Sequence, residues 1–430
     1  MNPEKPVSRV IHAAHIFRNI SIWLLLILLI SSGGCSFKRL KKDLEERDKL
    51  VRIRGEVIVQ AATRAPIMVL LLTSDPLQPT LLHYEVLATP GQFTFVVTPG
   101  SYRIFAYEDL NRDQRHQDNE RIGCSEEINA SRAGDQLSEI TILINETTDA
   151  ALRRMVDETK SKGKVDLVSL KRYVGKVVSL EEPFFAKKFV TMGLWQSHKF
   201  IQEVPLGIFF MEEFKSDKIP VLFIHGINGS PRFFTEIIAD LDREKFQPWL
   251  AYYPSGASID LVADYLYGTL EDLHARHDFK ALQIIAHSMG GLTTRALINR
   301  YSETGSHFDI DRIITISTPF SGHHAASMGL KYAPTVIPVW EDVEPESEFI
   351  QNLFRKPLPD NLSHYLLFSF EGKSRFAKGN SDGVVTIASE LRPEVQADAV
   401  MIRGFAENHT GILKNSQAIL LINQIMNHEQ

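Results

Sequence analysis

The sequence predicts an α/β domain that follows a small all-β domain, and two patterns support this prediction. From residue 205 to residue 430, apolar strand-like runs alternate with helix-like segments, which is typical of a mainly parallel sheet flanked by helices. From residue 55 to residue 145, short runs rich in β-branched and aromatic residues are separated by turns with Pro and Gly, which favours a β-sandwich. The 430 residues are enough for both domains.

The composition excludes several classes of protein. With 44% hydrophobic and 23% charged residues, and no periodic Gly or Pro, the chain is not collagen-like, a coiled coil or wholly disordered. A formal net charge of −6 gives no reason to expect nucleic acid as a partner, because domains that bind it usually carry a basic excess. The two cysteines, Cys35 and Cys124, provide neither a disulfide scaffold nor a cysteine zinc cluster.

Residues 1–35 are predicted to be an export signal. Basic residues precede an apolar run, Ile20 to Ile30, which is short for a bilayer span and ends in small residues. The next residues, Ser32-Gly33-Gly34-Cys35, resemble the lipobox of bacterial lipoproteins. This resemblance implies that Cys35 is diacylated and becomes the mature N-terminus. The alternative is an uncleaved signal anchor in which Cys35 has no role.

The same resemblance implies a lipid-anchored protein of the bacterial cell envelope. Ser36 stands where many lipoproteins kept at the inner membrane have Asp, which favours the outer membrane and a position facing the periplasm. Residues 36–54 are dense in charge and have few leucines, so we expect a solvated tether. Its basic side chains would add attraction to anionic headgroups.

The β domain, residues 55–145, contains a possible ion site. Its stretch from Phe93 to Tyr107 resembles the transthyretin-like or carboxypeptidase-regulatory-like modules of secreted enzymes. Loop 109–120 has oxygen-bearing side chains at calcium-loop spacing, and the ion would be structural. The alternative is a polar hairpin loop, since Gln114 stands where the sharp turn requires Gly. The candidate ligands are Asp109, Asn111, Asp113 and Glu120.

The α/β domain is predicted to occupy residues 205–430, after a linker and lead-in at 146–204 whose aromatic part is a candidate for the first strand. An apolar-faced helix begins at Ser258, and another runs from the end of a strand to Tyr301. The expected strands lie at 219–224, 249–253, 281–286, 313–316, 365–370 and 400–403.

The strand at 281–286 runs directly into Ala286-His287-Ser288-Met289-Gly290-Gly291. A serine hydroxyl can attack only if it stands clear of the sheet, and a sharp strand-to-helix turn places it there in a strained conformation. This segment resembles the nucleophile elbow of α/β-hydrolases, especially lipases and esterases. The resemblance implies that Ser288 is the nucleophile and that the domain has the α/β-hydrolase fold.

A second motif, His225-Gly226-Ile227-Asn228-Gly229-Ser230, follows the strand at 219–224. It resembles the HG oxyanion loop of the same enzymes. Backbone N–H groups in such a loop stabilise the tetrahedral oxyanion of acyl transfer. The resemblance implies that the donors are the amides of Ile227 and Met289, and that His225 is a turn residue and not the base.

The base and the acid follow from the chain order of this fold, which is nucleophile, acid, histidine. Beyond the expected acid only His409 and His428 remain, and His428 lies three residues from the C-terminus, so His409 is the predicted base. Histidine suits this role because its ordinary pKa of about 6.5 allows proton transfer at neutral pH. Asp382, in Ser-Asp-Gly-Val-Val, resembles the acid loop of bacterial lipases. The alternatives are Asp360 and Glu371.

An insertion at residues 320–361 is predicted to form a lid over the acyl pocket. It contains the pair His323-His324, for which we do not expect a metal, because adjacent histidines in a strand point apart and lack a third ligand.

Together these features indicate a membrane-tethered serine hydrolase, similar to triacylglycerol lipases and the inositol-deacylase-like group, that cleaves lipid or other hydrophobic acyl esters without a cofactor. Two alternatives stay open. The same triad serves thioesterases, amidases and phospholipases. The second alternative is a non-enzymatic envelope lipoprotein that binds a partner through its β domain.

Overall fold

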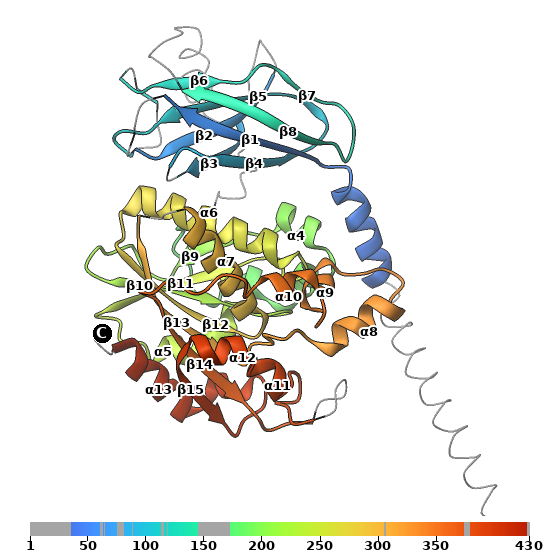
Figure 1. Ribbon diagram of the computed structural model, residues 1–430, viewed down its shortest axis with the longest axis vertical. Coiled ribbons are helices and arrows are strands. Elements are labelled where there is room, and N and C mark those ends of the chain that lie inside the picture. Colours follow the sequence, from blue (N-terminus) through green and yellow to red (C-terminus); the bar gives the residue numbers. More distant parts are fainter. Residues whose placement is uncertain are drawn as a thin grey trace, which may run out of the picture.

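The computed structural model describes residues 36–427, apart from 61–62, 64, 75–80, 88, 113–115, 118, 145–172, 305–306 and 374–378. It consists of an all-β domain that lies against an α/β domain (Figure 1). Cys35, the predicted export signal and residues 146–172 of the linker and lead-in lie outside the described residues. In the described part of the chain, no helix has the length and apolar character needed to cross a bilayer.

The all-β domain is built from two sheets, as the sequence predicts. Strands β4, β1 and β8 form one sheet, and β3, β2, β5 and β6 form the other, with β7 paired to β5. Buried side chains that alternate along β1 and β4 pack against those of the second sheet to form the core. The strands are β1 (Val51–Val59), β2 (Ile67–Thr73), β3 (Leu81–Leu87), β4 (Gln92–Val97), β5 (Gly100–Glu108), β6 (Ile122–Cys124), β7 (Ile128–Ala130) and β8 (Gln136–Ile144).

The α/β domain is built on a seven-stranded sheet, counted over the described residues, with the order β15-β14-β13-β12-β10-β11-β9. All neighbouring pairs are parallel except β11 and β9, which are antiparallel. The central strands are buried almost throughout because helices cover both faces. The strands are β9 (Gly207–Phe210), β10 (Ile219–Ile224), β11 (Phe246–Tyr252), β12 (Ala281–His287), β13 (Asp309–Ile316), β14 (Ser363–Ser369) and β15 (Ala399–Phe405).

Helices follow the strands in the alternating pattern that the sequence predicts. The two longest, α6 and α7, pack against each other on one face of the sheet. The helices after residue 230 are η2 (Pro231–Phe234), α5 (Thr235–Ala239), α6 (Ile259–His277), α7 (Met289–Thr304), α8 (His324–Tyr332), α9 (Pro338–Val343), α10 (Glu348–Asn352), α11 (Ile387–Glu390), α12 (Pro393–Asp398), η3 (Gly411–Lys414) and α13 (Ser416–Asn427).

The described part of the lead-in, residues 173–204, packs as part of the α/β domain. It forms η1 (Pro183–Phe185), α3 (Lys187–Trp195) and α4 (Ser197–Glu203), and the edge strand β9 begins only at Gly207. Phe185 is buried against Phe209 of β9 and Tyr252 of β11. The aromatic residues of this segment therefore close one side of the sheet.

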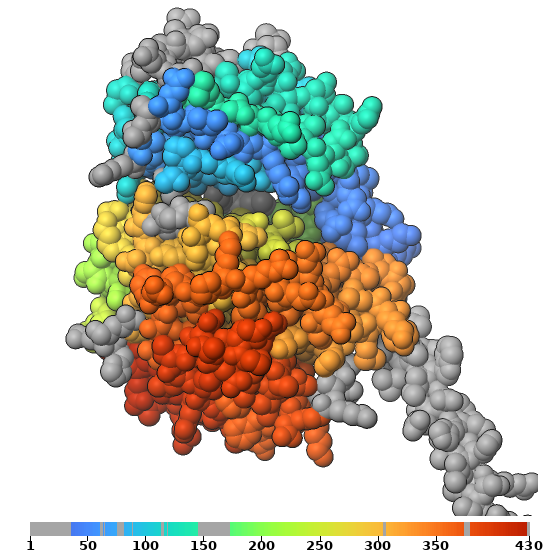
Figure 2. All heavy atoms as spheres, viewed as in Figure 1, coloured from blue at the N-terminus to red at the C-terminus, as the bar shows by residue number. Residues whose placement is uncertain are grey.

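Residues 36–54 form a docked segment where the sequence indicated a solvated tether. A helix spans 36–47, and β1 already begins at Val51. Leu40 is buried in the core of the α/β domain, and the Phe37 ring contacts Trp195 edge-on at 5.2 Å. Figure 2 shows this segment lying against the α/β domain. Except for the buried Asp43, the charged side chains of the helix are exposed, whereas Leu40 is buried.

The carboxylate of Asp43 fixes this helix to α4. Asp43 is buried, and its Oδ2 and Oδ1 accept the backbone N–H groups of His198 and Lys199 at 2.9 and 2.8 Å. These amides lie in the first turn of α4, where N–H groups lack partners within their own helix. Asp43 thus acts as an N-terminal cap supplied from a distant part of the chain.

The two domains meet where β3 packs on α6. Ala275 of α6 is buried with Met68 and Leu70 of β2, which belong to the face of the sheet turned away from the β-sandwich core. At the edge of this contact Arg112 forms an ion pair with Asp278 at 3.1 Å. Both faces of the second sheet are therefore covered.

Replacing Asp43 tests the docking of the N-terminal helix. We expect Asp43→Ala to lower the free energy of unfolding by about 1 kcal/mol, the usual cost of removing a helix N-cap. Asp48→Ala is the matched control, since the Asp48 side chain is exposed and pairs only with the exposed Arg47 among the described residues. Urea unfolding of both variants measures the difference, and equal effects would contradict the docking role.

Candidate active site

Ser288 lies at the sharp turn between β12 and α7. Its backbone has φ of +57°, in the left-handed region that non-glycine residues rarely adopt. The conformation is held by two hydrogen bonds: the Ser288 N–H donates to the Ile316 carbonyl at 2.8 Å, and the Gly291 N–H donates to the Ser288 carbonyl at 2.9 Å. The neighbouring strand therefore maintains the strain that presents this side chain at the edge of the sheet.

Two glycines allow the backbone to approach this turn. A Cβ on Gly290 would overlap the carbonyl oxygen of Ile224 at the end of β10. A Cβ on Gly226 would lie 2.7 Å from the Cβ of Ser288. The loop after β10 consequently lies directly against the serine, and only Gly fits at these two points.

His409 connects Ser288 to Asp382. It lies between β15 and η3, and its Nε2 is 2.9 Å from the Ser288 Oγ while its Nδ1 is 2.6 Å from the Asp382 Oδ2. With the proton on Nδ1, the ring donates to the carboxylate and accepts from the hydroxyl. The backbone N–H of His409 also donates to the Asp382 carbonyl at 3.0 Å. The structure thus brings together the three residues that the sequence proposed as a triad.

Asp382 is buried with several hydrogen-bond donors around it. Its Oδ1 accepts the N–H groups of Val384 and Val385 at 2.8 and 2.7 Å, and the Ser369 hydroxyl donates to Oδ2 at 3.2 Å. Burial raises the pKa of Asp382, but the hydrogen bonds and the charge interaction with His409 outweigh it, so the pKa lies below its ordinary value. The alternatives Asp360 and Glu371 are both exposed.

The backbone around the proposed oxyanion donors is held in place. The Asn228 N–H donates to the Ser255 hydroxyl at 2.9 Å, and the Gly229 N–H donates to the Gly226 carbonyl at 3.2 Å. Ile227 lies within this loop, and Met289 follows the serine as the first residue of α7. One amide belongs to the loop after β10 and the other to the start of α7, and these two segments meet at Ser288.

Two further histidines support the site; the sequence predicted only a turn position for His225 and assigned no role to His287. His287 donates from Nε2 to the His409 carbonyl at 2.8 Å, and His225 donates from Nδ1 to the Gly226 carbonyl at 2.9 Å. The ring of His225 stacks on Tyr253 at 4.3 Å, and the Tyr253 hydroxyl donates to the His225 carbonyl. Burial lowers the pKa of His287 to about 3 and that of His225 to about 4. Both are neutral at pH 7 and act as structural donors.

The proposed calcium loop belongs to the β domain, apart from the sheet that carries Ser288 (Figure 1). Asp113 lies outside the described residues. Both carboxylate oxygens of Glu120 accept backbone N–H groups, from Leu110 and Gln117, each at 2.8 Å. Asp109 is completely buried. Glu120 therefore closes the loop by hydrogen bonds to the backbone, and calcium binding stays a prediction.

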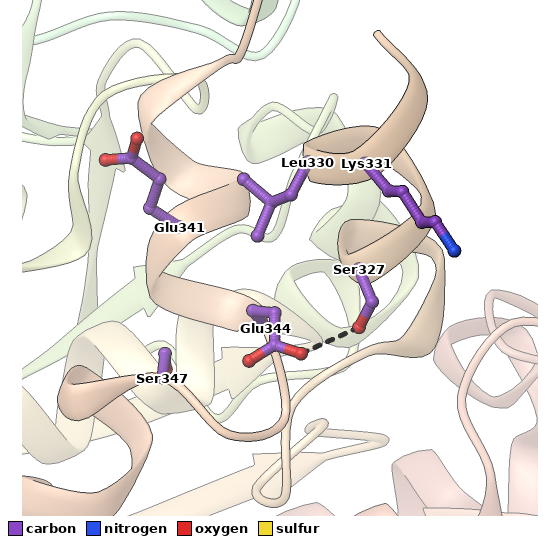
Figure 3. Close-up of a pocket in the computed structure, with 6 residues that line it drawn as sticks. All are labelled: Ser327, Leu330, Lys331, Glu341, Glu344 and Ser347. Atoms are coloured by element: carbon purple, nitrogen blue, oxygen red, sulfur yellow. Dashed lines mark hydrogen bonds between the residues drawn. The ribbon is translucent and has the colours of Figure 1, made fainter.

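The insertion at 320–361 contains α8, α9 and α10 and contacts the acid loop. His323 accepts the Ala325 N–H on Nδ1 at 3.1 Å and donates from Nε2 to the Val384 carbonyl at 2.9 Å. Both nitrogens of His323 are therefore engaged. A groove between α8 and α9 lies on this insertion, and there Ser327 donates to Glu344 at 2.8 Å (Figure 3). The groove is lined by Ser327, Leu330, Lys331, Glu341, Glu344 and Ser347, and by no residue of the Ser288 site.

Comparison with known proteins agrees with this architecture. Residues 254–425, which include Ser288, Asp382 and His409, match a family described as "Alpha/beta hydrolase of unknown function (DUF915)". The domain has the α/β-hydrolase fold. No curated protein matches the chain.

Solved structures that resemble part of the chain include the lin2722 product of Listeria innocua and the mature lipase BlEst2 of Bacillus licheniformis. Each is 16% identical with a TM-score of 0.39 and covers 50% of this chain, and the matches cover 96% and 94% of those proteins. Phospholipase PlaB of Legionella pneumophila is 15% identical with a TM-score of 0.33, and that match covers 40% of this chain and 45% of PlaB.

The buried neutral His225 predicts a loss of stability in acid. An unfolded histidine takes up a proton near its ordinary pKa of about 6.5, whereas folded His225 resists protonation down to about pH 4. The unfolded state binds more protons between these values, so the free energy of unfolding falls as the pH is lowered from about 6.5 towards 4.

The amide of His225→Asn can still donate to Gly226. In this variant we expect the decrease in the free energy of unfolding in acid to be smaller, by roughly 3 kcal/mol at most. The exposed His307→Asn is the control. Urea unfolding at a series of pH values measures both slopes. Equal slopes in the His225 variant and the parent would show that His225 titrates freely in the folded protein.

Proposed function

We propose that this protein is a serine hydrolase that cleaves carboxylic esters through an acyl-enzyme. The observation that carries the proposal is the continuous relay from the Ser288 hydroxyl through His409 to the Asp382 carboxylate, with contacts of 2.9 and 2.6 Å. Ser288 stands in a strained turn, and the acid is buried and hydrogen-bonded. This combination is that of an activated nucleophile, its base and the group that orients the base.

In the proposed reaction, the Ser288 Oγ attacks the ester carbonyl while His409 Nε2 takes the hydroxyl proton. Asp382 holds the Nδ1–H tautomer and stabilises the imidazolium that forms. The tetrahedral oxyanion accepts hydrogen bonds from the amides of Ile227 and Met289. His409 then returns the proton to the leaving alcohol, and water releases the acid from Ser288 by the reverse sequence.

We propose a lipid or another hydrophobic acyl ester as the substrate, because the protein would be lipid-anchored at Cys35, at the outer membrane of a bacterial envelope. The docked helix at 36–47 supports this arrangement. Phe37 contacts Trp195, which in turn contacts Trp340 of α9 at 6.1 Å. An anchor at position 35 would hold the insertion next to the membrane surface.

The insertion at 320–361 is the proposed lid. Ser288 is 6% exposed and His409 is 8% exposed, so a bulky acyl ester reaches the serine only after covering residues move. The insertion begins beside the acid loop, to which His323 is hydrogen-bonded. We propose that this segment opens to admit the acyl chain.

Thioesters, amides and phospholipids are alternative substrates of the same relay, and matched ester, thioester and amide substrates separate them by rate. A non-enzymatic lipoprotein that binds a partner through the β domain is the other alternative. It would leave the strained serine and the neutral supporting histidines without a role.

A fluorophosphonate probe tests the proposal on the mature, detergent-solubilised protein. We expect covalent labelling of the parent and none of Ser288→Ala, together with a loss of at least ~10³-fold in the hydrolysis of p-nitrophenyl butyrate and palmitate. The butyrate-to-palmitate ratio separates an esterase from a lipase. If the parent neither labels nor turns over either ester, the partner-binding alternative replaces this proposal.

Gly226→Ala tests the oxyanion loop separately from the nucleophile. The added methyl group would lie 2.7 Å from the Ser288 Cβ and must push the loop away. We expect kcat to fall about 10²-fold, as when one oxyanion donor is lost. Gly91→Ala is the matched control, since its Cβ meets only an ordinary contact at 3.8 Å. Equal kcat values for the two variants would place the oxyanion donors elsewhere.

A further inference from the structure

A second buried carboxyl group lies beside Asp382, and the mechanism above does not use it. Glu390 is the last residue of α11, and its side chain is completely buried. One carboxyl oxygen each of Glu390 and Asp382 and one ring nitrogen of His409 all lie within 4.8 Å of one another. The Glu390 carboxyl interacts with the Asp382 carboxyl, and also with the Ser317 side chain and the Ser369 backbone. Burying a carboxyl in this way is costly and therefore needs a reason.

The position of Glu390 is fixed by the short helix that carries it. The Glu390 N–H donates to the Thr386 carbonyl at 3.0 Å. The hydroxyl of Ser389 donates to the Gly322 carbonyl at 2.7 Å and accepts the Ser321 N–H at 3.2 Å. These contacts tie α11 to the start of the insertion. The carboxyl of Glu390 consequently stays directed towards Asp382.

The surroundings decide which of the two carboxyls carries the charge. Asp382 accepts hydrogen bonds from the amides of Val384 and Val385, from the Ser369 hydroxyl and from His409. Glu390 has fewer donors around it, the Ser317 side chain and the Ser369 backbone. Two carboxylates this close in a buried cluster cannot both be ionised, so the charge stays on Asp382 and the proton on Glu390. Burial, followed by the negative charge of Asp382, raises the pKa of Glu390 to about 10.

We propose that Glu390 is a positioning residue of the Ser288–His409–Asp382 relay, which stays protonated and donates its O–H to the Asp382 carboxylate. This inference rests on the proposed hydrolase function. The donated hydrogen bond shares part of the Asp382 charge, so the carboxylate holds the His409 proton less tightly. The Nε2 atom of His409 is then more readily available to accept the Ser288 proton. A second ionised carboxylate at this point would instead strengthen the hold on the His409 proton.

The other titratable groups around the cluster do not replace this effect. His287 of β12 faces His409, and His323 of the insertion faces both His409 and the acid loop. Burial lowers the pKa of each, that of His287 to about 3, so both are neutral when His409 works. Arg392, two residues beyond Glu390, pairs with Glu394 at 2.8 Å and lies over the Phe354 ring. The protonation state of Glu390 therefore decides whether one or two negative charges lie beside His409.

The pH profile of kcat/KM tests the proposal with two variants of similar side-chain volume. Glu390→Gln keeps a donor and cannot ionise, whereas Glu390→Leu removes the donor. We expect Glu390→Leu to move the midpoint of the acid limb up by about one pH unit, and so to lower kcat/KM about tenfold at pH values below both midpoints. Glu390→Gln should keep the midpoint of the parent.

The melting temperature separates this role from a merely structural one. Because the pKa of Glu390 is raised in the folded protein, the Glu390 side chain contributes stability below its ordinary pKa of about 4.5. That contribution is lost as the pH rises towards 10. At pH 8 both variants should therefore melt no lower than the parent. A Glu390→Leu variant whose acid limb coincides with that of the parent would overturn the proposal.

Infrared spectroscopy gives a readout that does not depend on turnover. At pH 8 the parent and Ser288→Ala should show the carbonyl band of a protonated carboxyl, and Glu390→Gln should lose it. Asp342, whose pKa burial raises to about 6, is ionised at this pH. Glu394→Gln is the control and should keep the band, because the hydrogen bond from Arg392 lowers the pKa of Glu394.

The two readouts distinguish the two proposals. Absence of the band in the parent would overturn the role of Glu390 even if the protein hydrolyses esters. The opposite outcome is a band that disappears in Glu390→Gln although the parent hydrolyses no ester and is not labelled by the fluorophosphonate. That outcome would overturn the proposed function but leave the protonated state of Glu390 supported.

Discussion

The site depends on the close approach of two backbone segments, the turn at Ser288 and the loop after β10. Gly226 and Gly290 permit this approach, and the Ile316 carbonyl holds Ser288 in its left-handed conformation. The carboxyl ends of parallel strands meet at the same edge of a sheet, so β10, β12, β14 and β15 all deliver residues there. The strand order therefore brings Ser288, Asp382 and His409 together. Hydrogen bonds from the buried neutral histidines His225 and His287 hold the loops that carry the site.

Much of the fold and of the candidate site was predictable, because the sequence patterns that indicate them are local. A buried strand followed by a small-residue turn and a helix specifies the elbow at Ser288 within a few residues, and the apolar run before Gly226 does the same for the loop. His409 followed from chain order alone. Asp382 rested on a resemblance, and its exposed alternatives are distinguished only by burial, which depends on the folded chain.

The unpredicted features depend on contacts between distant parts of the chain. Asp43 stands in a charge-dense run that is typical of a solvated segment, and only the docked helix reveals that it caps α4. Glu390 has the sequence context of a surface carboxylate, because nothing local shows that α11 turns back under Asp382. His287 sits in the motif itself, but its bond to the His409 carbonyl spans 122 positions. Such pairings leave no periodic pattern in the sequence.

The docked helix at 36–47 also changes how the domains are connected. The chain first packs on the α/β domain, then leaves it at β1 to build the β domain, and is packed on the α/β domain again at Tyr173. In topological terms the β domain is an insertion within the α/β domain rather than an N-terminal extension. A force applied at the N-terminus is consequently borne by the α/β domain directly. Truncation from the N-terminus cannot remove the β domain without also stripping away a helix of its neighbour, whereas an internal excision can.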